Sequence, residues 1–153
     1  MADKVLRIGG ASGFWGDAAR ATPQLLQVKG LDYIVYDYLA EITMSIMARA
    51  RAQDDSKGYA VDFVSAAMKP NLANIATRGI KVISNAGGVN PLACADALRA
   101  LIKEQGLDLS VACVVGDDLM GAAAELAAAG TTEMFSGEPF PAVSKLQSIN
   151  AYL

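Results

Sequence analysis

The chain has 153 residues, of which 53% are hydrophobic, and a net charge of −3 from 13 basic and 16 acidic side chains. This composition predicts a folded core and excludes a disordered chain. Without a basic cluster, no nucleic-acid partner is expected. The sequence has no histidine, which excludes His general bases, His metal ligands and a Ser-His-Asp triad.

Neither a signal peptide nor a run of about 18 apolar residues is visible in the sequence. We therefore expect no membrane segment. Cys94 and Cys113 lack the spacing of a disulfide framework or a metal site, and Cys113 lies in an apolar run that reads as a core strand. These features fit a reducing compartment, and we expect a cytoplasmic protein.

Apolar runs alternate with helical patterns along the chain, which predicts an α/β fold with a mostly parallel sheet. The runs are continuous, as is typical of strands covered on both faces. The predicted strands are Lys4–Ile8, Asp32–Tyr36, Ile80–Ser84, Ser110–Val115 and, with a weaker pattern, Gln147–Tyr152. We therefore expect a Rossmann-like three-layer sandwich with a sheet of about five strands.

A capping residue precedes several of the predicted helices. The predicted pairs are Asn90 before Leu92–Ile102, Asp118 before Leu119–Ala129, and Thr22 before Gln24–Val28. The crossover between the second and third strands carries two further helical patterns, Glu41–Ala52 and Tyr59–Arg78, with a polar turn between them. This pattern predicts a helical hairpin in the second crossover.

The length fits one domain, since domains commonly have about 100–150 residues. No helical pattern follows the last predicted strand to cover it. We therefore expect residues 1–153 to form a single α/β domain that is the N-terminal part of a longer domain or protein.

Ligands of open α/β sheets bind beyond the carboxyl ends of the strands, where this sequence places glycines and polar residues. The candidate ligand-binding residues are Gly10, Ser12, Gly13, Phe14, Trp15, Gly16, Asp17, Asn85, Gly87, Gly88, Asn90 and Asp118. Glycines allow backbone N–H groups to approach a ligand closely, although they equally suit a tight turn between strand and helix. Trp15 either walls a pocket or packs on the edge of the sheet.

Carboxylates at the strand ends are the candidates for acid/base chemistry, namely Asp37, Glu41 and Asp117. Glu41 follows Asp37 by four residues, so a helix that begins at Asp37 would place both on one face. With Asp118 these groups could also hold Mg²⁺, but we assign no metal site. Asp17 and Asp118 equally suit helix caps, and Glu41 suits the first turn of a helix.

The spacing of Gly10, Gly13 and Gly16 resembles the phosphate loop of extended short-chain dehydrogenases. Asp37 follows this loop by about 20 residues, as a ribose-binding acid would. Two features argue against dehydrogenase chemistry: Pro23 interrupts the helix expected after the loop, and no tyrosine is followed by a lysine four residues later. Among the three hypotheses for function, an NAD(P)-dependent dehydrogenase is therefore ranked last.

Several longer motifs, in order and at plausible spacing, resemble the N-terminal domain of the acyclic terpene utilisation family, AtuA type. They are RIGGASGFWGD, LDYIVYDYLAE, KVISNAGGVNP, VVGDDL and INAYL. The resemblance implies a role in the catabolism of acyclic terpenoids such as citronellol and geraniol, which proceeds through branched acyl-CoA thioesters. It also implies that family members continue beyond INAYL.

The first hypothesis for function is an enzyme, or an enzyme subunit, that acts on a terpenoid or branched acyl-CoA. Gly10, Gly13 and Gly16 would approach the phosphate or thioester portion, and Asn85 and Asn90 would orient polar groups. The alternative is a non-catalytic ligand-binding or assembly module for an acyl-CoA enzyme. A CoA thioester is the expected small-molecule ligand, and the alanine-rich helices suit a homo-oligomer.

Overall fold

The computed structural model describes residues 5–151. The chain divides into two compact units at the junction between Cys113 and Val114. The first unit contains a parallel sheet and the longer helices, and the second contains short helices and loops. Within the described residues, no helix is both long and apolar enough to span a bilayer.

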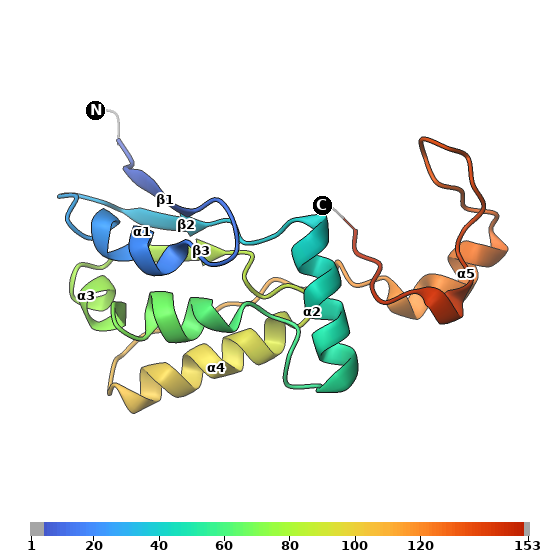
Figure 1. Ribbon diagram of the computed structural model, residues 1–153. Helices are drawn as coiled ribbons and strands as arrows, with labels where there is room; N and C mark the ends of the chain where they lie inside the picture. The colour runs from blue at the N-terminus through green and yellow to red at the C-terminus, as the bar shows by residue number, and fades with distance from the viewer. Residues whose placement is uncertain (1–4, 152–153) are drawn as a thin grey trace. The chain divides into compact units, whose positions relative to one another are not determined.

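The sheet of the first unit has three parallel strands in the order β1-β2-β3 (Figure 1). The strands are β1 (Ile8–Ser12), β2 (Tyr33–Tyr36) and β3 (Lys81–Ser84). In their register, Ile8 is paired with Tyr33, and Tyr33 with Lys81. The predicted α/β class with a parallel sheet is confirmed, because helices separate each strand from the next.

Helical segments follow each strand of the first unit. They are α1 (Ala18–Leu25), α2 (Glu41–Gln53), the π-helix η1 (Phe63–Met68), α3 (Leu72–Thr77) and α4 (Pro91–Glu104). Helix α1 packs against β1 and η1, and α4 packs against η1; α3 and α4 lie below the sheet in Figure 1.

The opposite face of the sheet is open. Ile8 and Ile83 point to that side and are 62% and 55% exposed, whereas Ala11 and Ile34 on the covered side are buried. Right-handed crossovers between strands in the unbroken order β1-β2-β3 place every connecting helix on the same face. The predicted three-layer sandwich is therefore not confirmed for the described residues, which have a sheet with one helical side.

The first strand lies further along the chain than the predicted Lys4–Ile8, whose first residue is outside the described part. Gly9 and Gly10 belong to β1, where they are paired with Ile34 and Val35. Glycine has a low β propensity, so the sequence pattern ends the strand too early; the pairing with β2 decides the outcome instead.

The predicted fourth and fifth strands are not confirmed. Ser110–Val115 contains no assigned strand, and the carbonyl of Val111 accepts a bond from the Arg99 guanidinium at 3.1 Å instead of a ladder bond. Apolar sequence alone cannot distinguish a buried strand from extended coil. In Gln147–Tyr152 the only assigned pairing among the described residues is an isolated antiparallel bridge from Asn150; Tyr152 lies outside them.

The prediction that Cys113 is a core strand residue is also wrong, since it lies in coil and is only half-buried. Cys94 on α4 is buried instead. Burial raises the pKa of the Cys94 thiol to about 12, so this cysteine is present as the unreactive thiol at neutral pH.

The predicted and observed helix boundaries agree best where the sequence carries a strong local signal. The Asn90 side chain accepts the N–H of Ala93 at 3.4 Å, and Pro91 begins α4, as predicted. Thr22 does not begin a helix: α1 starts at Ala18 and continues through Pro23. The interruption at Pro23 that we held against a dehydrogenase loop is therefore absent.

The second crossover contains the expected helices. Helix α2 begins at Glu41 as predicted, and the predicted stretch Tyr59–Arg78 divides into η1 and α3 around Pro70. Proline lacks a backbone N–H and clashes with the preceding turn, so it ends η1. The buried face of this segment supplies Phe63, which joins the core.

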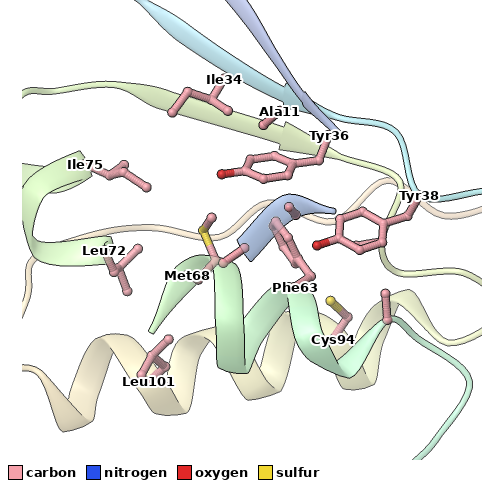
Figure 2. Close-up of a cluster of buried hydrophobic side chains, with 14 of the residues drawn as sticks. Ala11, Ile34, Tyr36, Tyr38, Phe63, Met68, Leu72, Ile75, Cys94 and Leu101 are labelled. Carbon is pink, nitrogen blue, oxygen red and sulfur yellow. The ribbon is translucent and has the colours of Figure 1, made fainter. Parts of the chain in front are cut away.

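The core lies between the sheet and the helices and is centred on three aromatic rings (Figure 2). Tyr36 and Tyr38 are each 1% exposed and Phe63 is 3% exposed. The Phe63 ring meets the Tyr36 ring edge-on at 5.2 Å and the Tyr38 ring at 5.7 Å between centroids. Edge-on pairs of this kind add to the free energy gained by burial.

Tyr36 should make the protein sensitive to alkaline pH. Burial raises its pKa from 10.0 to about 12, although its hydroxyl donates to Thr22 Oγ1 at 2.9 Å. The stabilisation is therefore complete below pH 10 and is lost as the pH rises towards 12, with a total of about 3 kcal/mol at most. Urea unfolding at increasing pH should show this loss, and Tyr36→Phe should flatten the profile; an equally steep profile in Tyr36→Phe would assign the loss to other groups.

The second unit consists of short elements. They are η2 (Met120–Ala122), α5 (Ala123–Ala128) and η3 (Val143–Lys145). Asp118 Oδ1 accepts the N–H of Met120 at 2.9 Å. The N-cap position of this helical segment is Leu119, one residue later than the predicted Asp118. The helix ends at Ala128, one residue before the predicted end.

Candidate functional site

Three side chains from consecutive strand ends meet beside the sheet, and we call Ser12, Asp37 and Asn85 the strand-end cluster. Asn85 Nδ2 donates to Asp37 Oδ1 at 2.7 Å, and Ser12 Oγ donates to the carbonyl of Asp37 at 2.7 Å. Asn85 Oδ1 also accepts the N–H of Tyr38 at 2.7 Å. The expected convergence of the first three strand ends is therefore observed.

Asp37 and Asn85 are both exposed, so the cluster is accessible to a ligand. Asn85 fixes the Asp37 carboxylate through one oxygen only. A carboxylate has several acceptor positions, and the remaining ones can serve a substrate. The cluster thus offers an oriented carboxylate, a hydroxyl and an amide at one edge of the sheet.

The residues Gly13–Gly16, called the glycine loop here, connect this cluster to α1. Asp17 Oδ2 accepts the N–H of Gly13 at 2.9 Å, and Ser12 Oγ contacts the carbonyl of Phe14 at 3.4 Å. Gly16 has a φ of 115°, which only glycine adopts readily. The glycine loop is therefore a tight turn between β1 and α1. A tight turn of this kind can also contact a ligand.

Trp15 anchors the glycine loop to the core. Its ring is half-buried and packs against the hydrophobic cluster, and its Nε1 donates to Asp62 Oδ1. Asp62 immediately precedes η1. Trp15 thus packs against the core, and its polar atom is bonded within the protein.

Gly87 and Gly88 are required by close packing. A Cβ on Gly87 would stand 2.8 Å from Pro91 Cα, and Gly88 has a φ of 52°. The N–H of Gly88 donates to the carbonyl of Asn85 at 3.1 Å. These two glycines shape the turn after β3, and the Gly88 N–H is not available to a ligand.

Gly88→Ala should destabilise the protein by about 1–3 kcal/mol. The new Cβ would collide with Met47 Sδ and stand 2.8 Å from the carbonyl of Gly58, in a backbone conformation that alanine adopts rarely. Gly10→Ala is the control, since no atom lies within 4 Å of its Cβ position. Chemical denaturation measures both, and equal stabilities of the two variants would contradict the packing.

Gly10 lies in a strand and Asn90 at the start of α4. Gly10 is a strand residue on the open side of the sheet and does not belong to the loop. Asn90 Nδ2 donates to the carbonyls of Asp55 and Lys57, each at 2.8 Å, and its Oδ1 caps α4. Both ends of the Asn90 amide are thus occupied by the protein itself.

Asp37 and Glu41 do not share a helix face, because α2 begins only at Glu41. Asp37 lies in the preceding extended segment, and among the described residues no hydrogen bond connects the Glu41 side chain to the cluster. Asp117 and Asp118 belong to the second unit. There Asp117 Oδ2 accepts from Asn150 Nδ2 at 2.8 Å.

Tyr38 and Asp62 are the neighbours that sequence reasoning missed. Tyr38 directly follows Asp37 and precedes the apolar Leu39, and no sequence pattern singled it out as a site residue. Asp62 could have been noticed as an acidic residue directly before a helix. Burial, followed by the charges of Asp62, Tyr36 and Asp17 in that order, raises the pKa of Tyr38 well above its usual value. Across residues 5–151, no three His, Cys, Asp or Glu side chains gather to form a metal site.

The chain matches a known protein family. The model of the family described as "Acyclic terpene utilisation family protein AtuA" matches residues 6–153, nearly the whole chain. Searches of curated proteins and of solved structures gave no match.

Proposed function

We propose that the strand-end cluster binds a branched terpenoid acyl-CoA. The chain belongs to the acyclic terpene utilisation family AtuA. The family name indicates a role in acyclic terpene utilisation. The observation that supports a site at this edge is the exposed Asp37 carboxylate, which Asn85 Nδ2 holds at 2.7 Å beside the glycine loop. Ligands of parallel α/β sheets bind at this end of the strands.

The glycine loop offers donors to the ligand. Within the described residues, the N–H groups of Phe14, Trp15 and Gly16 donate to no protein acceptor. The carboxylates of Asp17 and Asp37 lie near this loop and repel phosphate groups. We therefore assign the loop to the uncharged thioester carbonyl and leave the phosphates of CoA outside it.

This arrangement supports proton abstraction next to the thioester carbonyl. Asp37 would take the proton from the adjacent carbon, and the C–H electron pair would form the carbon–carbon double bond of an enolate. The π electron pair of the carbonyl would move onto its oxygen, which the loop N–H groups would stabilise. Asn85 orients the Asp37 carboxylate for this step. Asp37 is the catalytic residue in this proposal, and Asn85 is a positioning residue.

Calorimetry with a branched acyl-CoA tests binding. Asp37→Asn and Asn85→Ala should weaken the affinity by about tenfold or more, as expected for a lost bond to a charged group. Asp108→Asn and Asn74→Ala are matched controls, because both residues are exposed in the same unit and outside the cluster; they should leave the affinity unchanged. Equal affinities of all four variants would refute the site.

Deuterium uptake from heavy water into the acyl chain tests the chemistry. The wild type should exchange the hydrogen next to the thioester carbonyl, and Asp37→Asn should lose this exchange while keeping measurable binding. Binding by the wild type without exchange would instead support the non-catalytic module. A thermal-shift response to NAD(P) and not to acyl-CoA would support the dehydrogenase hypothesis.

A further inference from the structure

The Trp15 side chain connects the glycine loop to a distant part of the chain. Its Nε1 donates to Asp62 Oδ1 at 2.5 Å, across 47 positions of sequence. Within residues 5–151, the other hydrogen bonds of the loop are local, from Gly13 to Asp17 and from Ser12 to Phe14. The position of the loop against the core therefore depends on the packing of the Trp15 ring and on its bond to Asp62.

Asp62 is not needed as a helix cap. It stands at the N-cap position of η1, where an aspartate side chain commonly accepts a backbone N–H of the first turn. The Asp62 side chain makes no such bond, and its Oδ1 accepts from Trp15 instead. A hydrogen bond to a carboxylate is stronger than one between neutral groups, so this contact is well suited to hold a loop.

The backbone next to Asp62 is fixed by the core. Phe63, the following residue, is 3% exposed and contacts the rings of Tyr36 and Tyr38 edge-on (Figure 2). The helix that Phe63 begins is a π-helix, a rare form that is frequent at functional sites. Asp62 thus offers its carboxylate to Trp15 from a rigid support.

We propose that Asp62 is a positioning residue for the reaction: through Trp15 it holds the free backbone N–H groups of the glycine loop in place for the ligand oxygen. This role rests on the proposed function, in which these N–H groups stabilise an enolate. Donors that are fixed in advance stabilise a transition state because they need not reorient during the reaction. Asp62 itself touches neither the ligand nor the reacting atoms.

NMR relaxation of the free protein tests the positioning role without a ligand. The backbone order parameters of residues 13–16 should be near about 0.85 in the wild type and fall below about 0.6 in Asp62→Ala. Asp62→Asn keeps an acceptor oxygen and should restore the order. Asp108→Ala is the matched control, since Asp108 is an exposed aspartate of the same unit outside the loop. A loop that is equally ordered in Asp62→Ala, or already mobile in the wild type, would refute the role.

Trp15→Phe breaks the same contact from the other side, because phenylalanine keeps an aromatic ring but has no N–H donor. It should loosen the loop as Asp62→Ala does. The double variant should be no looser than either single variant, since both remove one and the same bond. Additive effects in the double variant would show that this bond does not hold the loop.

Deuterium uptake into a branched acyl-CoA links the contact to the reaction. Asp62→Ala should lower kcat for the exchange about tenfold and change KM by less than about threefold, because the loop N–H groups act on the transition state. Asp62→Asn should recover most of the rate. An unchanged kcat in Asp62→Ala would contradict the positioning role. A wild type without exchange would refute the proposed function, whereas the order parameters decide in either case whether Asp62 holds the loop.

Discussion

Phe63→Ala is expected to lower the free energy of unfolding by about 3–5 kcal/mol, the usual cost of removing a buried aromatic ring. The Phe63 ring is 3% exposed and contacts both core tyrosines edge-on (Figure 2). Its loss leaves a cavity between the sheet and η1 that close-packed neighbours fill only in part. Chemical denaturation of the wild type and the variant measures the difference.

Phe135→Ala is the matched control for this experiment. Phe135 is 87% exposed, so the same substitution should change the stability by less than about 0.5 kcal/mol. A loss below about 1 kcal/mol for Phe63→Ala would show that the aromatic cluster is not the core of the first unit.

Changes at Asn85 should have the second-largest effect. Asn85→Ala leaves the N–H of Tyr38 without its acceptor at 2.7 Å and should cost about 1–3 kcal/mol. Asn85→Asp keeps that acceptor but places a second carboxylate where Nδ2 stood, 2.7 Å from Asp37 Oδ1. The two negative charges then repel, so this variant should also lose stability at neutral pH.

The two Asn85 variants should differ in their response to acid. In Asn85→Asp a proton shared by the carboxylates removes the repulsion, so stability relative to the wild type should recover as the pH falls from 7 towards about 4. Asn85→Ala has no such pair and should show a constant deficit. Denaturation at both pH values measures this, and a deficit in Asn85→Asp that does not change with pH would mean that Asp37 and residue 85 are not in contact.

Local signals in the sequence predict much of the helical structure. Asn90 followed by Pro91 marks the start of α4 correctly because capping and the fixed φ of proline act within a few residues. The start of α2 at Glu41 is likewise predicted. Thr22 resembles a helix cap in the sequence, but it lies inside α1 and is buried. Its hydroxyl donates to the carbonyl of Ala18 and accepts a hydrogen bond from the Tyr36 hydroxyl.

Strand predictions depend on partners that a sequence does not show. Asp32–Tyr36 and Ile80–Ser84 agree with β2 and β3 to within one residue at their start. Gly9 and Gly10 join β1 because β2 lies beside them. Ser110–Val115 has the composition of a strand but no ladder partner among the described residues. Pairing, more than composition, determines these segments.

The candidate site is only partly visible in the sequence for a similar reason. Asp37 and Asn85 follow strands directly, so the rule for parallel sheets predicts that they converge, and they do. Asp62 is brought to Trp15 by the packing of η1 against α1, over 47 positions of chain. The sequence suggests that Gly88 belongs to a ligand-binding loop. Only the structure shows that Met47 leaves no room for a side chain at this position.

Chemical-shift mapping with a branched acyl-CoA tests the ligand site most directly. In the amide NMR spectrum of the labelled protein, the largest shifts on titration should fall on Gly13–Gly16, Tyr38 and Asn85. The open face around Ile83 should be unaffected. Shifts confined to that face or to the second unit, or no shifts at saturating ligand, would contradict a binding site at the carboxyl ends of the strands.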